Sequence, residues 1–167
     1  MSPVVHLTTK SSFDDSADRN AIARYCIAKG YEYRFSSKFD PVDMFAITTK
    51  GIRVALELTC NACWTDQLTY PETAIHIPRR KWKTFHEQTW NIPGKNFNRA
   101  EKAYLVILNT AHTRAAFIPF STILYDLALF TEHTRDIYEE PAIFVSVPVS
   151  YIQKYVDIPP EQKEIDV

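Results

Sequence analysis

Two acidic residues, Asp43 and Glu57, are spaced so that a β-hairpin would place their carboxylates side by side. Residues 42–49 and 52–59 are rich in β-branched and apolar side chains, and Lys50-Gly51 between them is typical of a turn. If the turn is centred at Lys50, position 43 lies opposite position 57, and the two Cβ atoms are about 4.5–5.5 Å apart. Carboxylates that close repel each other unless a cation lies between them. The hairpin therefore predicts a cation site.

A hard divalent cation is the ligand that this pair favours. Magnesium prefers oxygen ligands, keeps several waters and needs only one or two protein carboxylates together with a substrate phosphate. The alternative is a pair of exposed carboxylates on a strand face, paired with Arg53. Glu57 lies in an apolar strand, so we expect it to be at least half-buried and to need a partner. Asp40 is a rival to Asp43, whereas Asp18 is expected to be a charge near a helix N-terminus.

The composition favours one globular domain. The chain has 167 residues, of which 46% are hydrophobic and 13% aromatic, which suits a sizeable core and argues against disorder. Three glycines leave no room for a glycine-rich phosphate loop. No apolar run approaches the ~18 residues of a membrane span, and the N-terminal stretch is too polar for a signal peptide. Together with three cysteines, this predicts a cytoplasmic protein with reduced thiols and no membrane partner.

Periodicity and turn signals predict the elements that would position the acids. A helix over residues 14–29, ended by Gly30, and a strand over 31–35 precede the hairpin. Residues 121–131 suit either a helix or an irregular segment. The remaining predicted elements are strands at 73–77, 103–109, 114–120 and 142–147, a basic helix at 79–89, and a short helix at 149–156.

This order of elements predicts an α+β (α/β) domain. We expect a single domain over residues 14–156, built around a central mixed β-sheet flanked by helices. Residues 1–13 are expected to form an N-terminal extension, and residues 157–167 a charged C-terminal tail.

The net charge of −1 hides an uneven distribution. Residues 74–125 contain eight basic and two acidic side chains, whereas residues 126–167 contain three and nine. A basic helix that also carries Trp82 suits the phosphates of a nucleic acid, although a solvated helix face explains it equally well. The acidic C-terminal region would suit a protein partner. The residues expected to contact nucleic acid are Lys38, Arg79, Arg80, Lys81 and Lys83.

Cys60 and Cys63 form a CxxC pair with three open interpretations. As a zinc site the pair would need His76 and His86, which only the tertiary fold could bring near. As a redox motif it follows a strand, but the rest of the thioredoxin-like pattern is absent. The third interpretation is ordinary buried or free thiols. Three cysteines are too few for a four-cysteine iron–sulfur cluster.

The element order and the spacing of the acids resemble the PD-(D/E)XK nuclease superfamily, in particular archaeal Holliday junction resolvases and small phage-encoded relatives. The residues that carry the resemblance are Pro41-Val42-Asp43, Glu57-Leu58-Thr59 and the strand-to-basic-helix passage at 70–82. It covers roughly residues 14–120. It implies a restriction-endonuclease-like core, DNA as substrate, a homodimer and, for a phage-encoded protein, the host cytoplasm.

The resemblance also implies a metal-dependent reaction. Asp43, Glu57 and the main-chain carbonyl of Leu58 would bind Mg²⁺ or Mn²⁺ for hydrolysis of a phosphodiester bond. The lysine that the family places two residues after the glutamate is Thr59 here. Residues 57 and 59 share a strand face, and a threonine cannot supply positive charge. Either a cation arrives from elsewhere or catalysis is lost, and the candidate cations are Lys38, Lys50, Arg79 and Lys81.

These observations leave three functional hypotheses. The first is a metal-dependent DNA endonuclease or resolvase-like protein with catalytic positions at Asp43, Glu57 and Thr59. Its catalysis would be weakened, because Thr59 replaces the lysine. The second is a catalytically inactive nuclease-fold module that binds nucleic acid or a protein partner. The third is a thiol or zinc protein centred on Cys60 and Cys63.

Overall fold

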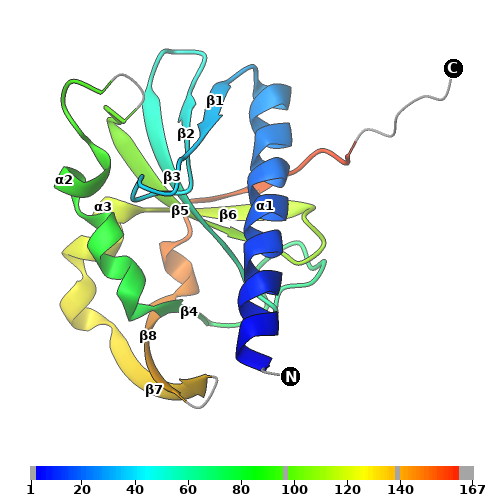
Figure 1. Ribbon diagram of the computed structural model, residues 1–167, viewed down its shortest axis with the longest axis vertical. Helices are drawn as coiled ribbons and strands as arrows, with labels where there is room; N and C mark the ends of the chain where they lie inside the picture. Colours follow the sequence, from blue (N-terminus) through cyan, green and yellow to red (C-terminus); the bar gives the residue numbers. More distant parts are fainter. Residues whose placement is uncertain (1–2, 96–97, 138–139, 162–167) are drawn as a thin grey trace, which may run out of the picture.

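A six-stranded mixed sheet forms the centre of the computed structural model, which describes residues 3–95, 98–137 and 140–161 (Figure 1). The strand order is β1-β2-β3-β5-β6-β9. β3 and β5 run parallel, and the other neighbours in this sheet are antiparallel. The strands are β1 (Glu32–Phe35), β2 (Met44–Ile47), β3 (Arg53–Cys60), β5 (Lys102–Leu108), β6 (Arg114–Pro119) and β9 (Lys154–Asp157).

The β2–β3 hairpin has the register that a turn centred at Lys50 predicts. Met44 lies opposite Leu56, and Ile47 lies opposite Arg53. Gly51 adopts a φ of 79°, a left-handed conformation that glycine reaches without a steric penalty. Continuing the same register by one residue places position 43 opposite position 57, and the Asp43 N–H donates a hydrogen bond to the Leu56 carbonyl at 3.1 Å.

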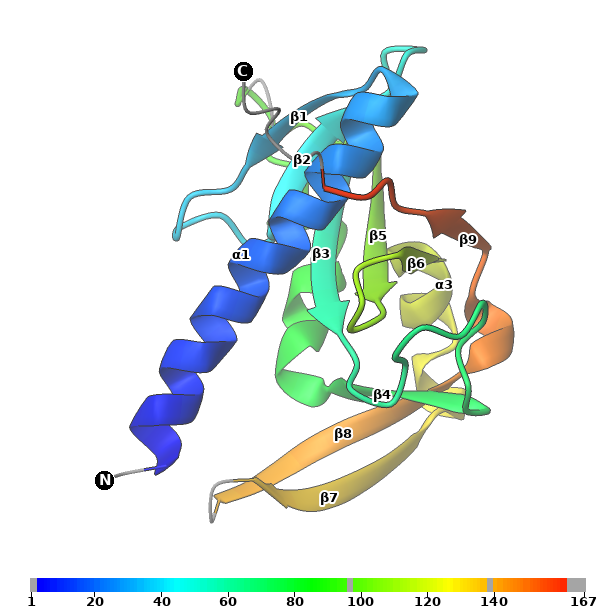
Figure 2. The same ribbon diagram turned by 90° about the vertical axis from the view of Figure 1, so that its right-hand side faces the viewer.

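One long helix, α1 (Pro3–Lys29), crosses one face of the sheet (Figure 2). Its buried residues Ala21, Ile22, Tyr25 and Cys26 recur at helical spacing and pack against the even-numbered residues of β3. Gly30 ends the helix as predicted, with a φ of 75°. The N–H of the next residue, Tyr31, donates a hydrogen bond to the Cys26 carbonyl in the last turn of the helix. The start differs from the prediction, because the helix continues back to Pro3 through a stretch without a regular apolar stripe.

The opposite face is covered by the crossover from β3 to β5. The crossover contains β4 (Ala74–Pro78), the 3₁₀ helix η1 (Arg79–Phe85) and the short helix α2 (Glu87–Trp90). The single helix predicted at 79–89 is therefore wrong, because His86 takes an extended conformation (φ −74°, ψ 136°) that separates two shorter helices. Trp82, Phe85 and Trp90 anchor this layer in the core.

The region after β6 contains helices α3 (Phe120–Tyr125) and η2 (Leu127–Leu129) and then a second sheet. That sheet has the order β4-β8-β7, with β7 at Thr131–Ile137 and β8 at Glu140–Pro148. β7 was not predicted from the sequence, and β4 belongs to this sheet rather than to the central one. The β7–β8 hairpin lies at the same end of the molecule as the N-terminus of α1 (Figures 1 and 2).

The short helix predicted at 149–156 is also wrong. A single 3₁₀ turn, η3 (Val149–Tyr151), is followed by β9, in which Tyr155 and Val156 pair with Ala116 and Ala115 of β6. The Tyr155 ring lies edge-on to Trp64 at a centroid distance of 5.8 Å. Residues 154–157 therefore form a strand because they pair with β6 and because the Tyr155 ring packs on Trp64. These tertiary contacts override the local helix propensity.

The buried residues form two clusters, one on each face of the central sheet. The chain is thus a single α+β domain with a mixed central sheet flanked by helices, as the sequence predicted. Within the ranges that the structure describes, none of the helices combines the length and the hydrophobicity needed to cross a lipid bilayer.

Candidate functional site

A cavity of about 560 Å³ opens at the carboxyl end of β3, between α1 and η1. Glu57 to Cys60 of β3 line it, together with charged residues of both signs from neighbouring elements. The acidic lining residues are Asp18, Asp43 and Glu57, and the basic ones are Arg80, Lys81 and Lys83. The two acids that the sequence predicts to converge therefore share one cavity.

Asp43 is held in place by two neighbours. Its Oδ2 accepts a hydrogen bond of 2.7 Å from the main-chain N–H of Leu58, and its Oδ1 lies 3.6 Å from a guanidinium nitrogen of Arg19 on α1. The side chain keeps 23% of its surface exposed, and Asp43 lines the cavity. Asp43 is thereby tied to the same residue whose carbonyl is the third predicted metal ligand.

Glu57 is the more deeply buried acid, at 7% exposure. It lies on the η1 face of β3, because its neighbours Leu56 and Leu58 pack toward α1 whereas Ala55 belongs to the opposite cluster. A carboxylate this buried is stable only with compensating charge or hydrogen bonds, which the mixed lining of the cavity can provide.

Lys81 supplies positive charge next to the position where Thr59 lacks it. Its ammonium group donates a hydrogen bond of 3.3 Å to the carbonyl oxygen of Leu58, and Thr59 lines the same cavity. The oxygen donors of Asp43, Glu57 and the Leu58 carbonyl thus fit a hard divalent ion.

The other three candidate cations lie elsewhere. The Lys38 ammonium is placed over the ring of Phe39 at 5.0 Å, and Arg79 forms an ion pair of 3.6 Å with Glu132 of β7. Lys50 is exposed in the β2–β3 turn. Among the residues that the structure describes, Lys81 is the candidate that lines the cavity.

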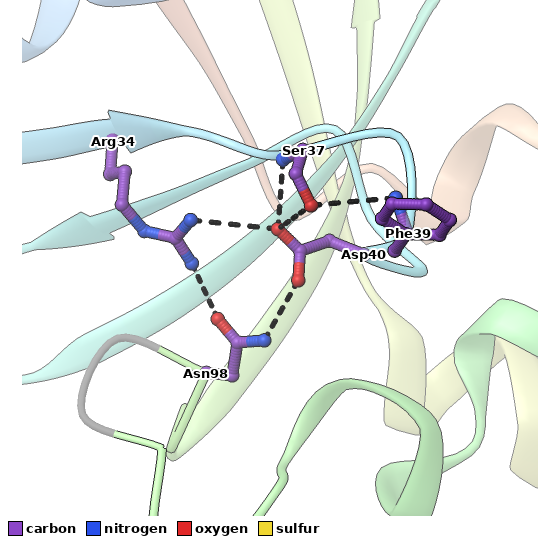
Figure 3. A network of polar contacts seen from close by, with 5 residues as sticks. All are labelled: Arg34, Ser37, Phe39, Asp40 and Asn98. Atoms are coloured by element: carbon purple, nitrogen blue, oxygen red, sulfur yellow. Dashed lines mark hydrogen bonds and ion pairs between the residues drawn. The ribbon is translucent and has the colours of Figure 1, made fainter.

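Asp40 has a different role from Asp43. Its carboxylate accepts hydrogen bonds from the Ser37 N–H at 2.9 Å and from the Asn98 amide at 2.9 Å, and Arg34 lies 3.5 Å away (Figure 3). Burial raises the pKa of Asp40, but the Asn98 and Ser37 hydrogen bonds and the Arg34 charge outweigh it and hold the pKa below its usual value. Asp40 therefore fastens the β1–β2 connection to residue 98 and does not line the cavity.

The prediction for Asp18 is wrong. Because α1 begins at Pro3, Asp18 lies in the body of the helix, where every main-chain N–H has a helical partner. It is 2% exposed, and its Oδ1 lies 2.7 Å from His112 Nε2 in the turn between β5 and β6. The sequence signal that could have found it is a lone aspartate on the apolar stripe of α1, four residues before Ile22. Arg19 and His112 were also missed.

The CxxC pair is divided between two environments. Cys63 Sγ lies 3.2 Å from the Tyr70 hydroxyl. Cys60 lines the cavity together with Asp18, and its sulfur, an Asp18 oxygen and a His112 ring nitrogen lie within 4.8 Å of one another. His76 lies on the second sheet, 3.0 Å from Ser146. In the described part of the chain, no group of three metal-ligating side chains includes Cys63, His76 or His86, so the predicted completion of a CxxC zinc site is not found.

Comparison with known proteins supports the architecture. No family model matches the chain, and no curated protein matches it. Among solved structures, the Holliday junction resolvase Hjc of the archaeal hyperthermophile Archaeoglobus fulgidus is similar, with a TM-score of 0.50 and 10% sequence identity over 87% of this chain and 92% of that one. The chain has the fold of that resolvase. The likeness concerns the fold alone, and it agrees with the predicted single α+β domain around a mixed central sheet.

Proposed function

We propose that this protein is a metal-dependent DNA endonuclease of the resolvase type, which hydrolyses phosphodiester bonds at the cavity beside β3. The observation that carries the proposal is the convergence of Asp43, Glu57 and Lys81 on one cavity in a resolvase fold. Two acids with an adjacent cation are the groups that a metal-assisted attack on a phosphodiester requires.

Asp43, Glu57 and the Leu58 carbonyl would hold Mg²⁺ or Mn²⁺. The ion would supply charge neutralisation at the phosphate and would lower the pKa of a water molecule. The chain's own contribution is orientation: the Leu58 N–H fixes Asp43, and burial fixes Glu57. Both carboxylates therefore need little reorganisation when the ion arrives, which keeps the site ready for catalysis.

Lys81 takes the electrostatic role that Thr59 cannot fill. Its ammonium group already lies in the cavity, at a carbonyl oxygen, where it can approach a bound phosphate. Arg80 and Lys83 line the same cavity and would hold phosphates on either side of the reacting one. Arg79 and Lys38, which are engaged by Glu132 and Phe39, would contribute less to DNA binding.

A junction substrate presents two symmetric strands, so we further propose that the enzyme acts as a homodimer in the cytoplasm of its cell or host. The second candidate function is a module that binds nucleic acid or a protein partner without cleavage. Thr59 favours that candidate, because it removes the motif cation from the strand. Part of the acidic C-terminal region proposed to contact a protein, residues 162–167, lies outside the described residues.

A cleavage assay with a matched pair of variants tests the proposal. The protein is incubated with a four-way junction, a linear duplex and single-stranded DNA in Mg²⁺ or Mn²⁺. We expect cleavage that Glu57→Gln lowers by at least about 100-fold, the scale of removing one charge-stabilising group. Glu32→Gln, on the exposed outer strand β1, is the control and should retain activity.

Two results would contradict the nuclease. Full activity of Glu57→Gln would remove the proposed mechanism. An absence of cleavage on all three DNAs, combined with no rise in Tm up to millimolar Mg²⁺ or Mn²⁺, would favour the non-catalytic module, because a metal-binding native state must be stabilised by mass action.

A further inference from the structure

We propose that Asp18, Cys60 and His112 form a second metal site, which takes zinc or a similar thiophilic divalent ion. A carboxylate oxygen, a sulfur and a ring nitrogen from these residues all lie within 4.8 Å of one another. They come from the middle of α1, the end of β3 and the β5–β6 turn. Three segments that are distant in the sequence thus deliver one potential ligand each to the same point.

Cys60 of this site lies on the other face of β3 from Glu57. Leu56 and Leu58 belong to the buried cluster that contains Ile22 of α1, whereas Ala55 belongs to the cluster on the η1 side. Since side chains alternate along a strand, Cys60 is on the α1 face and Glu57 is on the η1 face. Asp18 and Cys60 line the same cavity as Asp43 and Glu57, but the two sets of ligands do not share a residue.

The ligand types separate the two sites chemically. Mg²⁺ binds oxygen donors and gains little from a thiolate, whereas zinc accepts cysteine sulfur, histidine nitrogen and carboxylate oxygen together. Three protein ligands leave one of zinc's four positions for water or another small ligand. We therefore expect zinc to prefer Asp18, Cys60 and His112 even in the presence of excess magnesium.

The turn that carries His112 is built to hold the ring toward α1. His112 has a φ of 54°, which is uncommon for a residue other than glycine. Asn109, which is fully buried, accepts hydrogen bonds from the N–H groups of Thr113 at 2.9 Å and Arg114 at 3.1 Å. This network fixes the turn in the conformation that brings His112 Nε2 to within 2.7 Å of Asp18.

Metal binding requires only small movements of these side chains. Ligands at about 2.0–2.3 Å from a tetrahedral zinc ion are separated from one another by roughly 3.3–3.8 Å. The His112–Asp18 pair, at 2.7 Å, would open slightly, and the remaining separations, which are within 4.8 Å, would close slightly. Binding would require the Cys60 thiol to give up its proton to solvent, because a thiolate is the form that binds zinc.

Cobalt is the probe that tests the thiolate ligand directly, because a cysteine bound to Co²⁺ gives a sulfur-to-metal charge-transfer band in the near ultraviolet. We expect the full chain to give this band at one equivalent of Co²⁺. Cys60→Ser should abolish the band, and Cys63→Ser, three residues away in the same motif and packed on Tyr70, should retain it. No band in the full chain, or a band that survives Cys60→Ser, would overturn the proposal.

A second variant addresses the histidine without disturbing the turn. Asparagine tolerates the left-handed conformation, so His112→Asn should fold, which circular dichroism can verify. We expect its zinc affinity, measured by competition with a chromophoric chelator, to fall by at least about tenfold, in the range that loss of ligand-shell groups produces. Equal zinc affinity of the wild type and His112→Asn would show adventitious binding.

These measurements do not depend on DNA cleavage. If Glu57→Gln and the wild type are both inactive while the cobalt band behaves as expected, the nuclease proposal fails and the zinc site remains. The reverse result would leave the nuclease and remove the zinc site.

Discussion

The ammonium group of Lys81 lies 3.3 Å from the carbonyl oxygen of Leu58, so a residue of the crossover reaches the end of β3. η1 packs on this face of the sheet through Trp82 and Phe85, which are both buried. A lysine one position before Trp82 is thereby directed toward the strand end. The positive charge that the nuclease motif expects at position 59 can thus come from a different element.

Replacing Lys81 tests whether that charge is functional. In the Lys81→Met variant, the aliphatic part of the side chain is kept and the charge is lost. We expect the cleavage rate constant to fall by about 100-fold, equivalent to about 2.7 kcal/mol of transition-state stabilisation. Single-turnover kinetics at saturating enzyme would measure the fall.

Lys83→Met is the matched control for Lys81→Met, because both lysines line the cavity and it is Lys81 that donates the hydrogen bond to the Leu58 carbonyl. We expect Lys83→Met to weaken DNA binding. A plot of the logarithm of the DNA association constant against the logarithm of the salt concentration should become less steep by about one, as loss of one phosphate contact does. Equal loss of the cleavage rate constant in both variants would show that Lys81 acts only as a general phosphate contact.

Moving the charge back to the strand gives a complementary prediction. In the double variant Lys81→Met/Thr59→Lys, a lysine on the same strand face as Glu57 again enters the cavity. We expect it to recover at least about tenfold of the rate lost in Lys81→Met, because catalysis depends on the position of the charge. The control is Lys81→Met/Thr59→Met, in which the new side chain adds bulk without charge. An equal recovery of the cleavage rate constant in this control would contradict the explanation.

The hairpin and the C-terminal part of α1, from residue 14 to its end, could be predicted from the sequence because local signals specify them. The turn at Lys50-Gly51 sets the register of Asp43 against Glu57, and Gly30 ends α1. Lys81 could be named only as one of four candidates, since its distance to Leu58 depends on the packing of η1 against the sheet. β9 and the Asp18–His112 contact depend on partners far away in the chain, about which local periodicity carries no information.

The Asp40 network predicts an effect on stability with a defined pH dependence. Asn98→Ala removes an amide that is 4% exposed and that donates to Asp40, so the pKa of Asp40 should rise toward its usual value. A lost hydrogen bond to a charged group costs about 1.5–3 kcal/mol. We expect a loss of this size at neutral pH, measured by urea denaturation.

The sign of the pH effect follows from the lowered pKa of Asp40. The stabilisation is present above the unfolded-state pKa of about 3.9 and disappears as pH falls through the lower folded-state value. The difference between Asn98→Ala and the wild type should therefore shrink in acid. Asn20→Ala, an exposed position on α1, is the control and should change stability by less than about 0.5 kcal/mol. A difference that stays constant down to strong acid would contradict the charged interaction.

The three thiols should differ in reactivity. Burial raises the pKa of Cys26 to about 11, and its side chain is 1% exposed, so little thiolate is available near pH 8. Cys60 and Cys63 are half-buried. We expect iodoacetamide to label Cys60 and Cys63 before Cys26, as peptide mass spectrometry would show. In denaturant the three cysteines should be labelled at similar rates. Modification of Cys26 in the native protein before Cys60 and Cys63 would contradict the prediction.

The parallel pairing of β3 with β5 has a consequence for the order in which the molecule matures. The pairing of Val54 to Cys60 with Lys102 to Leu108 closes a loop that contains residues 61 to 101, including Lys81. Contacts between segments so far apart form slowly, because closing a long loop costs entropy before it is rewarded. During folding, the hairpin that brings Asp43 and Glu57 together would thus form early, and the loop that contains Lys81 would reach its final position late. Any cleavage activity should appear only after β5 has paired with β3.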